Sequence, residues 1–347
     1  MRSRAAFAPP YGKGMPALDP AVAEVRLAVR TALSGVEATS VVVALSGGPD
    51  SLALAAATAF EAPKLGLAAT AVIVDHALQP GSDAAASRAA DQARALGLAA
   101  CIVRVEVTAA GDGPEAAARS ARYRALTGAA ADLGAAAVLL GHTLDDQAET
   151  VLLGLARGAG ATSLAGMAAV RRDEASGVLL VRPLLAVRRA TTLTACAAAG
   201  LEPWHDPQNA DPAFARVRVR ELVLPVLERE LGPGVAEALA RTADQLREDT
   251  AAFDEMIDET IEDIVEHAEA GISVSVGALA ANPPALRHRI IRHVVASEFG
   301  QSLTRTQTLE VARLVTDWAG QGPLDLPGCR ARRVGARIEF TAAGPPS

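Results

Sequence analysis

The sequence predicts an α/β fold, a Rossmann-like parallel sheet with helices on both faces, followed by a smaller, mainly helical α+β domain. Three observations support this prediction. Short apolar runs that favour strands alternate with alanine-rich runs that favour helices. The strand-like runs are almost continuously apolar, as in strands that are covered on both faces. The length of 347 residues exceeds what a single core usually holds, so we expect two domains.

The first domain follows from the alternation of its elements. Strands are expected at residues 41–45, 71–75, 102–107 and 137–140, and a fifth run at 178–185 either extends the sheet or connects the domains. Helices are expected between them at 52–60, 84–96 and 114–133. Since parallel sheets of this kind bind ligands beyond the carboxyl ends of their strands, functional residues are expected there.

The chain is expected to consist of three parts. Residues 1–20 resemble a disordered leader rather than a secretory signal, and Met15 is an alternative start. Residues 21–215 form the predicted α/β domain, and residues 216–347 form the helical linker and small domain, the expected region of contact with a polyanion. The second domain should contain helices at 219–230, 235–267, 284–299 and 305–318, a strand at 272–276 and a strand pair around Gly335.

Composition excludes several classes of protein. Cys101, Cys196 and Cys329 are far apart, which argues against a zinc ribbon, an iron–sulfur site or a redox dithiol and fits a reducing cytoplasm. No apolar run approaches the ~18 residues of a membrane span, so no membrane partner is expected. The net charge of −7 does not indicate a general nucleic-acid binder. Arginine clusters at 216–220, 287–292 and 330–337 nevertheless fit local contact with a polyanion, or else solvated faces.

The segment between the first predicted strand and helix is the most informative. It reads Ser46-Gly47-Gly48-Pro49-Asp50-Ser51, and such a strand–glycine turn–helix unit presents backbone N–H groups and a positive helix end to an anion. Glycines allow close approach of a phosphate, and Asp50 is an oxygen ligand suited to Mg²⁺. The Gly-Lys-Ser/Thr ending of a Walker A loop is missing. A phosphate-binding loop of another type is therefore predicted.

A second polar segment follows the fourth predicted strand. At about 100° per residue, a helix here would place His142, Asp145, Asp146 and Glu149 within one arc of about 100°. The opposite, packing side would hold Leu144, Ala148, Val151, Leu152 and Leu155. Clustered carboxylates repel one another, so this arrangement suits a cation, either Mg²⁺ or a substrate amine. The alternative is a solvated acidic face.

These segments resemble the signatures of a known family. The loop at 46–51 is similar to the S-G-G-x-D-S pyrophosphatase loop of the ATP-pyrophosphatase (PP-loop) superfamily. Residues 141–160, G-H-T-L-D-D-Q-A-E-T-V-L-L-G-L-A-R-G-A-G, resemble the second signature of tRNA(Ile)-lysidine synthases. Further motifs of that family follow in the same order, namely V-D-H-A-L at 74–78, E-A-A-A-R-x-x-R-Y at 115–123, R-P-L-L at 182–185, W-H-D-P-Q-N at 204–209 and F-A-R-V-R-V-R at 214–220.

The resemblance implies a carbon–nitrogen ligase that uses ATP with Mg²⁺. Its substrates would be free L-lysine and tRNA(Ile) with a CAU anticodon, whose wobble cytidine is adenylated and then converted to lysidine. Decoding would change from AUG to AUA, and charging from methionine to isoleucine. The implied location is cytoplasmic, and a homodimer is left open.

Residue roles are carried over motif by motif. ATP binding is expected at residues 46–51 and at Asp75 and His76, and Mg²⁺ binding at Asp50 and Asp146. The remaining catalytic candidates are Asp145, Glu149, His142 and Arg119, with Asp145 and Glu149 expected to position and deprotonate lysine. For Arg216, Arg218 and Arg220 we favour contact with RNA phosphate or nucleotide over ion pairs with Glu221 or Asp206.

Two other functions remain open at this stage. A tRNA 2-thiolation enzyme shares such a loop, but it would need gathered cysteines. A non-catalytic nucleotide- or RNA-binding module would not need Asp50, Asp145, Asp146 and Glu149 together. Both alternatives are therefore less favoured than the ligase.

Overall fold

A computed structural model describes residues 18–76, 81–105, 114–204, 211–268 and 271–343, and everything that follows concerns these residues. The chain divides into two compact units, residues 1–245 and 246–347. This division falls later in the chain than the boundary expected after residue 215, and the domain assignment itself stays a prediction. Most of the predicted leader lies outside the described residues.

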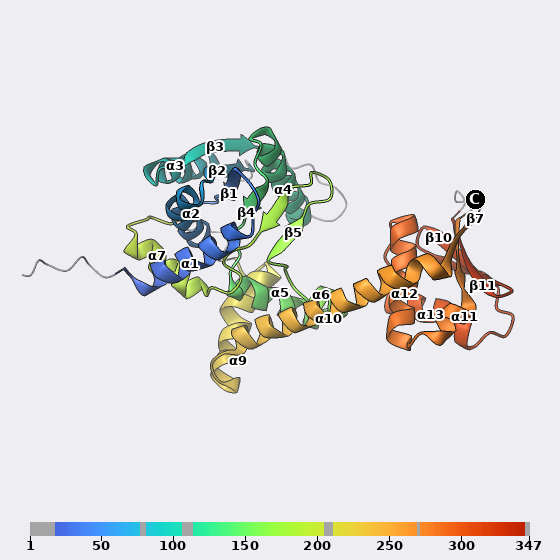
Figure 1. The fold of residues 1–347 in the computed structure, drawn as a ribbon. Helices are drawn as coiled ribbons and strands as arrows, with labels where there is room; N and C mark the ends of the chain where they lie inside the picture. Colours follow the sequence, from blue (N-terminus) through green and yellow to red (C-terminus); the bar gives the residue numbers. More distant parts are fainter. Residues whose placement is uncertain (1–17, 77–80, 106–113, 205–210, 269–270, 344–347) are drawn as a thin grey trace, which may run out of the picture. The chain divides into compact units, whose positions relative to one another are not determined.

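The first unit contains a six-stranded, mostly parallel sheet with the order β3-β2-β1-β4-β6-β5 (Figure 1). All four predicted strands are present, and the fifth run extends the sheet as β6. The edge strand β5, which was not predicted, pairs antiparallel with β6. The strands are β1 (Ser40–Ala44), β2 (Ala68–Asp75), β3 (Ala99–Arg104), β4 (Ala137–Leu139), β5 (Val170–Arg172) and β6 (Leu179–Val181).

Helices cover both faces of this sheet, as predicted. Sequence reasoning missed the two longer helices α1 and α7 and the short helices α6 and α8. The helices are α1 (Pro20–Ser34), α2 (Pro49–Glu61), α3 (Ser82–Ala95), α4 (Pro114–Asp132), α5 (Leu144–Ala156), α6 (Ala161–Leu164), α7 (Arg189–Ala198), α8 (Ala215–Arg218), α9 (Leu224–Leu231) and α10 (Val235–Ile264). A short 3-10 turn η1 (Ala62–Leu65) follows α2, and a π-helical turn η3 (Val219–Val223) joins α8 to α9.

Successive side chains of β1 point to opposite faces of the sheet and pack into two separate apolar cores. Val41 and Val43 point into a core shared with α1, α2, α3 and α7, whereas Val42 points into a second core beneath α4. All three valines are buried, and burial of such a side chain contributes about 1.5–3 kcal/mol. The central strands are thus fixed between two apolar layers, which holds their carboxyl ends in place.

The strand order reverses between β1 and β4, which is the position where α/β sheets of this type bind ligands. The loop after β1 and the turn after β4 meet at this point. A Cβ atom at Gly141 would lie 3.1 Å from the backbone nitrogen of Ser51, which is tighter than nine in ten real Cβ contacts. A glycine at position 141 therefore lets the two chain segments pack directly against each other.

The second unit is an antiparallel sheet with the order β7-β8-β11-β10-β9, packed with helices around its own core. It confirms the predicted strand at 272–276 and the strand pair around Gly335, and adds β7 and β9. The elements are β7 (Val265–Ala268), β8 (Gly271–Ser275), α11 (Val276–Ala281), α12 (Pro284–Phe299), α13 (Arg305–Thr316), β9 (Leu324–Leu326), β10 (Cys329–Val334) and β11 (Arg337–Ala342). The end of α10 contributes Ile257 and Ile264 to this core.

Part of the basic character of the second unit is structural. Arg287 is buried and donates hydrogen bonds to the carbonyls of Leu279, Ala280 and Asn282, so it closes the turn between α11 and α12. Arg332 pairs with Glu339 across β10 and β11.

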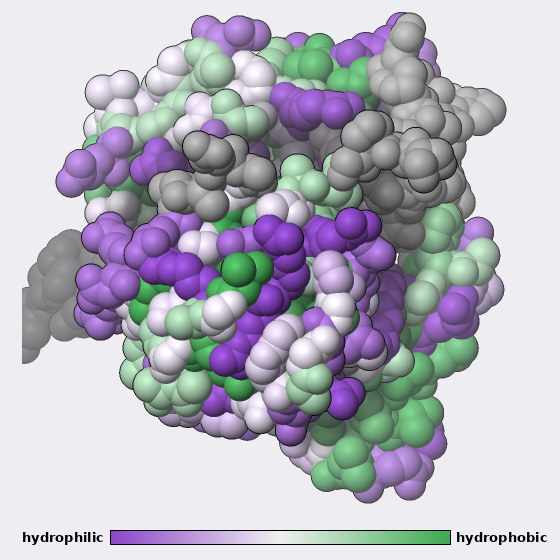
Figure 2. Space-filling view, turned by 90° about the vertical axis from the view of Figure 1, so that its right-hand side faces the viewer, coloured by the Kyte–Doolittle hydropathy of each residue, from purple (hydrophilic) through white to green (hydrophobic). Residues whose placement is uncertain are grey.

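Figure 2 shows hydrophilic and apolar residues intermixed over the face in view. Within the described ranges, no helix has both the length and the apolar character needed to cross a membrane.

A buried carboxylate links the first two helices, and its removal tests the stability of this contact. Glu61 is fully buried and accepts hydrogen bonds from Arg30 at 2.9 and 3.0 Å, and the bond from Arg30 holds the pKa of Glu61 below its ordinary value of 4.5 although burial opposes this. We expect Glu61→Gln to lower the free energy of unfolding by about 1 kcal/mol at neutral pH. Glu24→Gln, on the exposed side of α1, should change nothing.

The pH dependence of this effect has a definite sign. A depressed pKa stabilises the fold at pH values above 4.5, and the stabilisation is lost as pH falls through the folded-state pKa. The difference between wild type and Glu61→Gln in urea denaturation should therefore shrink in acid. A difference that persists unchanged at about pH 3 would contradict this account.

Candidate active site

The loop after β1 has the geometry of an anion-binding turn. Gly47 has a φ of 82°, a conformation that favours glycine, and Gly48 is the N-cap of α2, with Pro49 at the first helical position. The Ser51 hydroxyl donates to the Gly48 carbonyl at 3.0 Å and accepts from the Ser46 N–H at 3.2 Å. Ser46 is exposed, so the corner is accessible. The positive end of α2 therefore faces an open loop.

The turn after β4 places the second set of predicted residues. Thr143 is the N-cap of α5, and a capping box joins it to Asp146, whose Oδ2 accepts from the Thr143 N–H at 2.8 Å. The helix therefore starts at Leu144, and His142 precedes it instead of lying on its polar face as predicted. Leu155 was also placed wrongly, because it is exposed and not on the packing side. Glu149 lies one helical turn after Asp146 and Asp145.

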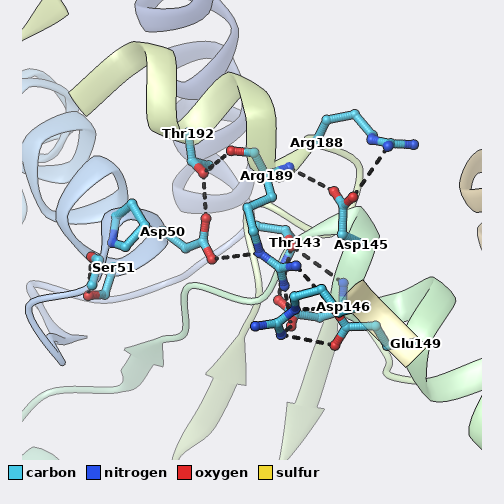
Figure 3. A network of polar contacts seen from close by, with 12 residues as sticks. Asp50, Ser51, Thr143, Asp145, Asp146, Glu149, Arg188, Arg189 and Thr192 are labelled. Atoms are coloured by element: carbon cyan, nitrogen blue, oxygen red, sulfur yellow. Dashed lines mark hydrogen bonds and ion pairs between the residues drawn. The ribbon is translucent and has the colours of Figure 1, made fainter. Parts of the chain in front are cut away.

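One guanidinium gathers the predicted carboxylates (Figure 3). Arg189, the first residue of α7, contacts Asp146 Oδ1 at 2.8 Å, Glu149 Oε1 at 3.0 Å and Asp50 Oδ2 at 3.4 Å. Its backbone N–H donates to Asp145 Oδ2 at 2.7 Å. Carboxylates from α2 and α5 are thus brought to one place by a cation from α7.

The carboxylates in this cluster differ in their electrostatic surroundings. Burial raises the pKa of Asp50, although a hydrogen bond from the Thr192 hydroxyl and the charge of Arg189 oppose the rise. Burial has the same tendency at Asp146, but there Arg189 and the hydrogen bond from the Thr143 backbone outweigh it, so the pKa of Asp146 is lowered. Asp50 is therefore the easier of the two to protonate.

Glu149 is surrounded by positive charge. Its carboxylate is fully buried and accepts from Arg216 at 3.0 Å and from Arg220 at 2.8 Å, in addition to Arg189. Arg216 lies on α8, and Arg220 lies on the π-helical turn η3. The turn is followed by Pro225, which has no backbone N–H to donate to a carbonyl of the preceding turn. These arginines are helical, and their acidic partners in the described residues are Glu149 and, for Arg220, also Asp146, instead of Glu221. Asp206 lies outside the described residues.

Arg218 does not join the cluster. It is exposed, and its guanidinium donates to the carbonyls of Pro212 and Ala213. The structure thus separates Arg218 from Arg216 and Arg220, although the sequence groups all three.

The remaining predicted nucleotide contacts lie at neighbouring strand ends. Asp75, the last residue of β2, is buried, with Arg104 Nε 3.4 Å from its Oδ2. Burial lowers the pKa of His76, and the charge of Arg122 acts in the same direction. Burial lowers the pKa of His142 to about 3, so this imidazole is neutral at physiological pH. Arg119, on α4, donates to the Tyr123 hydroxyl at 3.3 Å.

A small cavity opens beside the carboxylates. Its volume is about 140 Å³, well below the ~300 Å³ at which pockets for drug-sized ligands begin. It is lined by acidic, basic and apolar side chains together. These residues are Asp145, Glu149, Arg188, Arg189, Arg220, Leu224, Pro225, Glu228 and Ala236.

The carboxylate oxygens of Asp50 and Asp146 are the candidate ligands for a metal ion. Asp50 and Asp146 offer the hard oxygen ligands that Mg²⁺ prefers. The Asp146 Oδ1, which takes no part in the capping box, and the Asp50 Oδ2 both contact Arg189, so the guanidinium stands where a shared cation would bind. In the described part of the chain, no group of three or more His, Cys, Asp or Glu side chains is arranged to hold a metal. The chemistry of the oxygens fits Mg²⁺ once Arg189 withdraws from them.

Sequence reasoning missed the basic residues at the start of α7. Arg189 bridges the carboxylates, Arg188 pairs with Asp145 at 3.3 Å and with Glu237 at 2.9 Å, and Thr192 binds Asp50. The available signal was the arginine pair 188–189, followed by a polar and apolar helical pattern a few residues after β6. No motif that we had singled out contained it.

The cysteines bear on the thiolation alternative. Cys196 is buried in α7 and donates to the Pro49 carbonyl, Cys101 lies in β3, and Cys329 lies in the second unit. They belong to three separate elements. The gathered cysteines that thiolation would need are not found in the described residues.

Comparisons with known proteins agree with this geometry. The sequence matches the family model described as PP-loop domain over residues 22–227 and the one described as TilS substrate binding domain over residues 275–338. In solved structures, the U34-tRNA thiolase NcsA from Methanococcus maripaludis has a similar fold, with a TM-score of 0.56 and 20% identity, over 66% of this chain and 80% of that chain. At this identity the likeness concerns the fold alone.

Two curated relatives are much more similar. The tRNA(Ile)-lysidine synthase of Leifsonia xyli subsp. xyli is 60% identical over 301 residues, covering 86% of this chain and 89% of that protein. That of Salinispora arenicola is 52% identical over 339 residues, covering 96% of this chain and 100% of that protein. The chain belongs to the tRNA(Ile)-lysidine synthase family.

Proposed function

We propose that this protein joins free L-lysine to the wobble cytidine of tRNA(Ile) with a CAU anticodon, at the expense of ATP. The observation that carries the proposal is the meeting of a phosphate-binding loop with a carboxylate cluster at the strand-order reversal, in a chain of this family. ATP use follows from the PP-loop domain. The free cysteines suit a cytoplasmic location.

The reaction has two steps, and both balance with these substrates. The C2 carbonyl oxygen of cytidine attacks the α-phosphorus of ATP, and pyrophosphate leaves. The ε-amine of lysine then attacks C2, and AMP leaves with the oxygen while the amine loses a proton. Adenylation converts a poor leaving group into a good one, so one difficult displacement becomes two easier ones.

Residues of the loop after β1 would hold the pyrophosphate portion. Ser46, Gly47 and Gly48 lie at the positive end of α2, and Ser51 is already positioned by its bond to the Gly48 carbonyl. Asp50 and Asp146 would hold Mg²⁺, which offsets charge on the phosphates when bound. Asp75 and His76, at the end of β2, are candidates for the ribose or adenine.

The small cavity is the proposed lysine site. An amino acid carries an ammonium group, a carboxylate and an apolar chain, and the cavity offers acidic, basic and apolar walls. Asp145 and Glu228 suit the amines, Arg188 suits the carboxylate, and Leu224 suits the methylene groups. The cavity borders Glu149 and Arg189, which places a bound amine beside the carboxylate cluster.

Of the two predicted bases, Asp145 is better placed than Glu149. Both oxygens of Glu149 accept bonds from guanidinium groups and its side chain has no exposed surface. Both carboxylates border the cavity, and Asp145 is held by the Arg189 N–H and by Arg188, but its side chain is 17% exposed and it contacts one guanidinium instead of three. Lysine must attack as a neutral amine, so we assign proton removal to Asp145.

The first prediction concerns the overall reaction. Incubation of the protein with ATP, Mg²⁺, labelled lysine and a tRNA(Ile) transcript bearing CAU should transfer the label into RNA. The same transcript with uridine at the wobble position should remain unlabelled, because it lacks the nucleotide to be modified. Absence of label from the CAU transcript, with an active relative as positive control, would refute the proposal.

The second prediction concerns Asp50. Asp50→Ala should reduce tRNA-dependent release of pyrophosphate at least about 100-fold, because it removes a carboxylate proposed to hold the metal beside the phosphates. Asp83→Ala is the matched control, since Asp83 is an exposed acidic residue in the first turn of α3. Circular dichroism would verify the fold of both variants. Turnover of Asp50→Ala at the wild-type rate would contradict the proposal that Asp50 holds the metal.

The third prediction separates the two half-reactions. Asp145→Asn keeps an oxygen to accept from the Arg189 N–H but removes the base, so we expect lysine transfer to slow by about 100-fold. The KM for lysine should also rise, while pyrophosphate release without lysine stays within about twofold of wild type. Glu221→Gln, on the exposed side of η3, is the control. An equal loss in both half-reactions would contradict the assignment of Asp145 as the base that acts on lysine.

A further inference from the structure

A cluster of positive charge lies beside the carboxylates without being part of them. We define the arginine cluster as Arg119 and Arg122 of α4 together with Arg182, which directly follows β6. Arg182 is buried and Arg122 is half-buried. The cluster surrounds Tyr123, whose ring centroid is 5.1 Å from the guanidinium carbon of Arg119 and 5.8 Å from that of Arg122.

The arginine cluster has no negative partner among the described residues. Arg119 donates to the Tyr123 hydroxyl, and Arg182 donates to the Ala168 carbonyl at 2.7 Å. Burial lowers the pKa of Arg122; Tyr123 opposes this shift, and the charges of Arg119 and Arg216 add to it. Burial likewise lowers the pKa of Arg182, again opposed by Tyr123 and supported by the charges of Arg171 and Arg119. Gathering like charges in a partly buried place is unfavourable unless an anion neutralises them.

Buried polar atoms in the same place lack partners. Within the described ranges, the Nε of Arg182 and the Nδ1 atoms of His142 and His76 have no hydrogen-bond partner. Each lies near the carboxyl end of a different strand, namely β6, β4 and β2. Buried polar atoms are normally hydrogen-bonded, so these positions indicate a polar ligand, and the Nε–H of Arg182 requires an acceptor oxygen.

We propose that the arginine cluster is a second phosphate site, separate from the loop after β1, and that it holds a backbone phosphate of the RNA next to the target nucleotide. Guanidinium groups bind phosphate with paired N–H donors, which suits three arginines around one position. This inference rests on the proposed function, because it assigns the site to the same RNA substrate.

The position of the cluster favours RNA over the triphosphate of ATP. The triphosphate has its own site at the N-terminus of α2, on the sheet face that carries α1 and α7. The arginine cluster projects from α4, which covers the opposite face, and from the end of β6. A nucleotide drawn out of the anticodon loop brings a phosphate on each side of its ribose. Tyr123 adds an aromatic surface of the kind on which unstacked bases rest.

The fourth prediction tests Arg122→Gln in the full-length protein. Affinity for the CAU transcript, measured by filter binding over a range of KCl concentrations, should fall about tenfold. The plot of log affinity against log salt should become shallower by about 0.7, the change for one phosphate of a single strand. Affinity for ATP, measured by equilibrium dialysis without RNA, should remain unchanged.

A matched variant controls for loss of charge as such. Arg124→Gln removes the same charge from an exposed position two residues further along α4 and should leave both affinities unchanged. Weaker ATP binding with intact RNA binding in Arg122→Gln would reassign the site to the nucleotide and overturn the proposal. Unchanged binding of both ligands would also overturn it.

A chemical change in the RNA locates the contact. A neutral methylphosphonate, placed in turn at each of the two phosphates that flank the wobble cytidine, should weaken wild-type binding at one of them. The same replacement should have no further effect in Arg122→Gln, because the contact is already lost. Additive effects of the two changes would disprove a direct contact.

The outcomes also distinguish this inference from the proposed function. Wild-type protein that binds the transcript through Arg122 but transfers no lysine would refute the ligase proposal and leave the phosphate site standing. Lysine transfer by wild type, together with unaltered RNA affinity in Arg122→Gln, would refute the phosphate site and leave the ligase proposal standing.

Discussion

The contact of Arg189 with three carboxylates organises this site. Asp50, Asp146 and Glu149 come from two helices, and as anions in one partly buried place they would repel each other. The guanidinium removes that repulsion and ties α7 to both helices. It also stands where a divalent cation would share Asp50 and Asp146. The Mg²⁺ ion that we propose at these two carboxylates would compete with the arginine for the same oxygens, so its binding would require movement of Arg189.

The fold supplies the positions that this contact requires. Strand order reverses between β1 and β4, so the loop after β1 and the turn after β4 are neighbours although 90 residues or so separate them in sequence. Gly141 allows the direct approach of the two segments. The capping box of Thr143 and Asp146 then fixes the start of α5, so that one carboxylate both begins a helix and faces the site.

Local patterns predicted what depends on local structure. The apolar run at 41–43 gave the central strand, and the helix at 284–299 was predicted with its observed ends. The side chains in contact with Glu149 depend on tertiary packing, which is why Arg189 was missed and why the sequence did not show that Arg218 lies apart from Arg216 and Arg220. His142 was misplaced for a local reason. Thr143 caps the helix, so the helix begins at Leu144 and His142 lies outside it.

Negative and positive side chains lie on different sides of the site, and each side suits a different substrate group. Carboxylates and the small cavity lie toward α5, α7 and α9, whereas unpaired arginines lie toward α4 and β6. An amine is attracted to the first side and a phosphodiester chain to the second. His142, which is neutral, adjoins both Asp146 and the arginines and thus lies at the border. Cytidine held at this border would face adenylation from the loop after β1 and attack by an amine from the acidic side, so the two half-reactions need no exchange of sites.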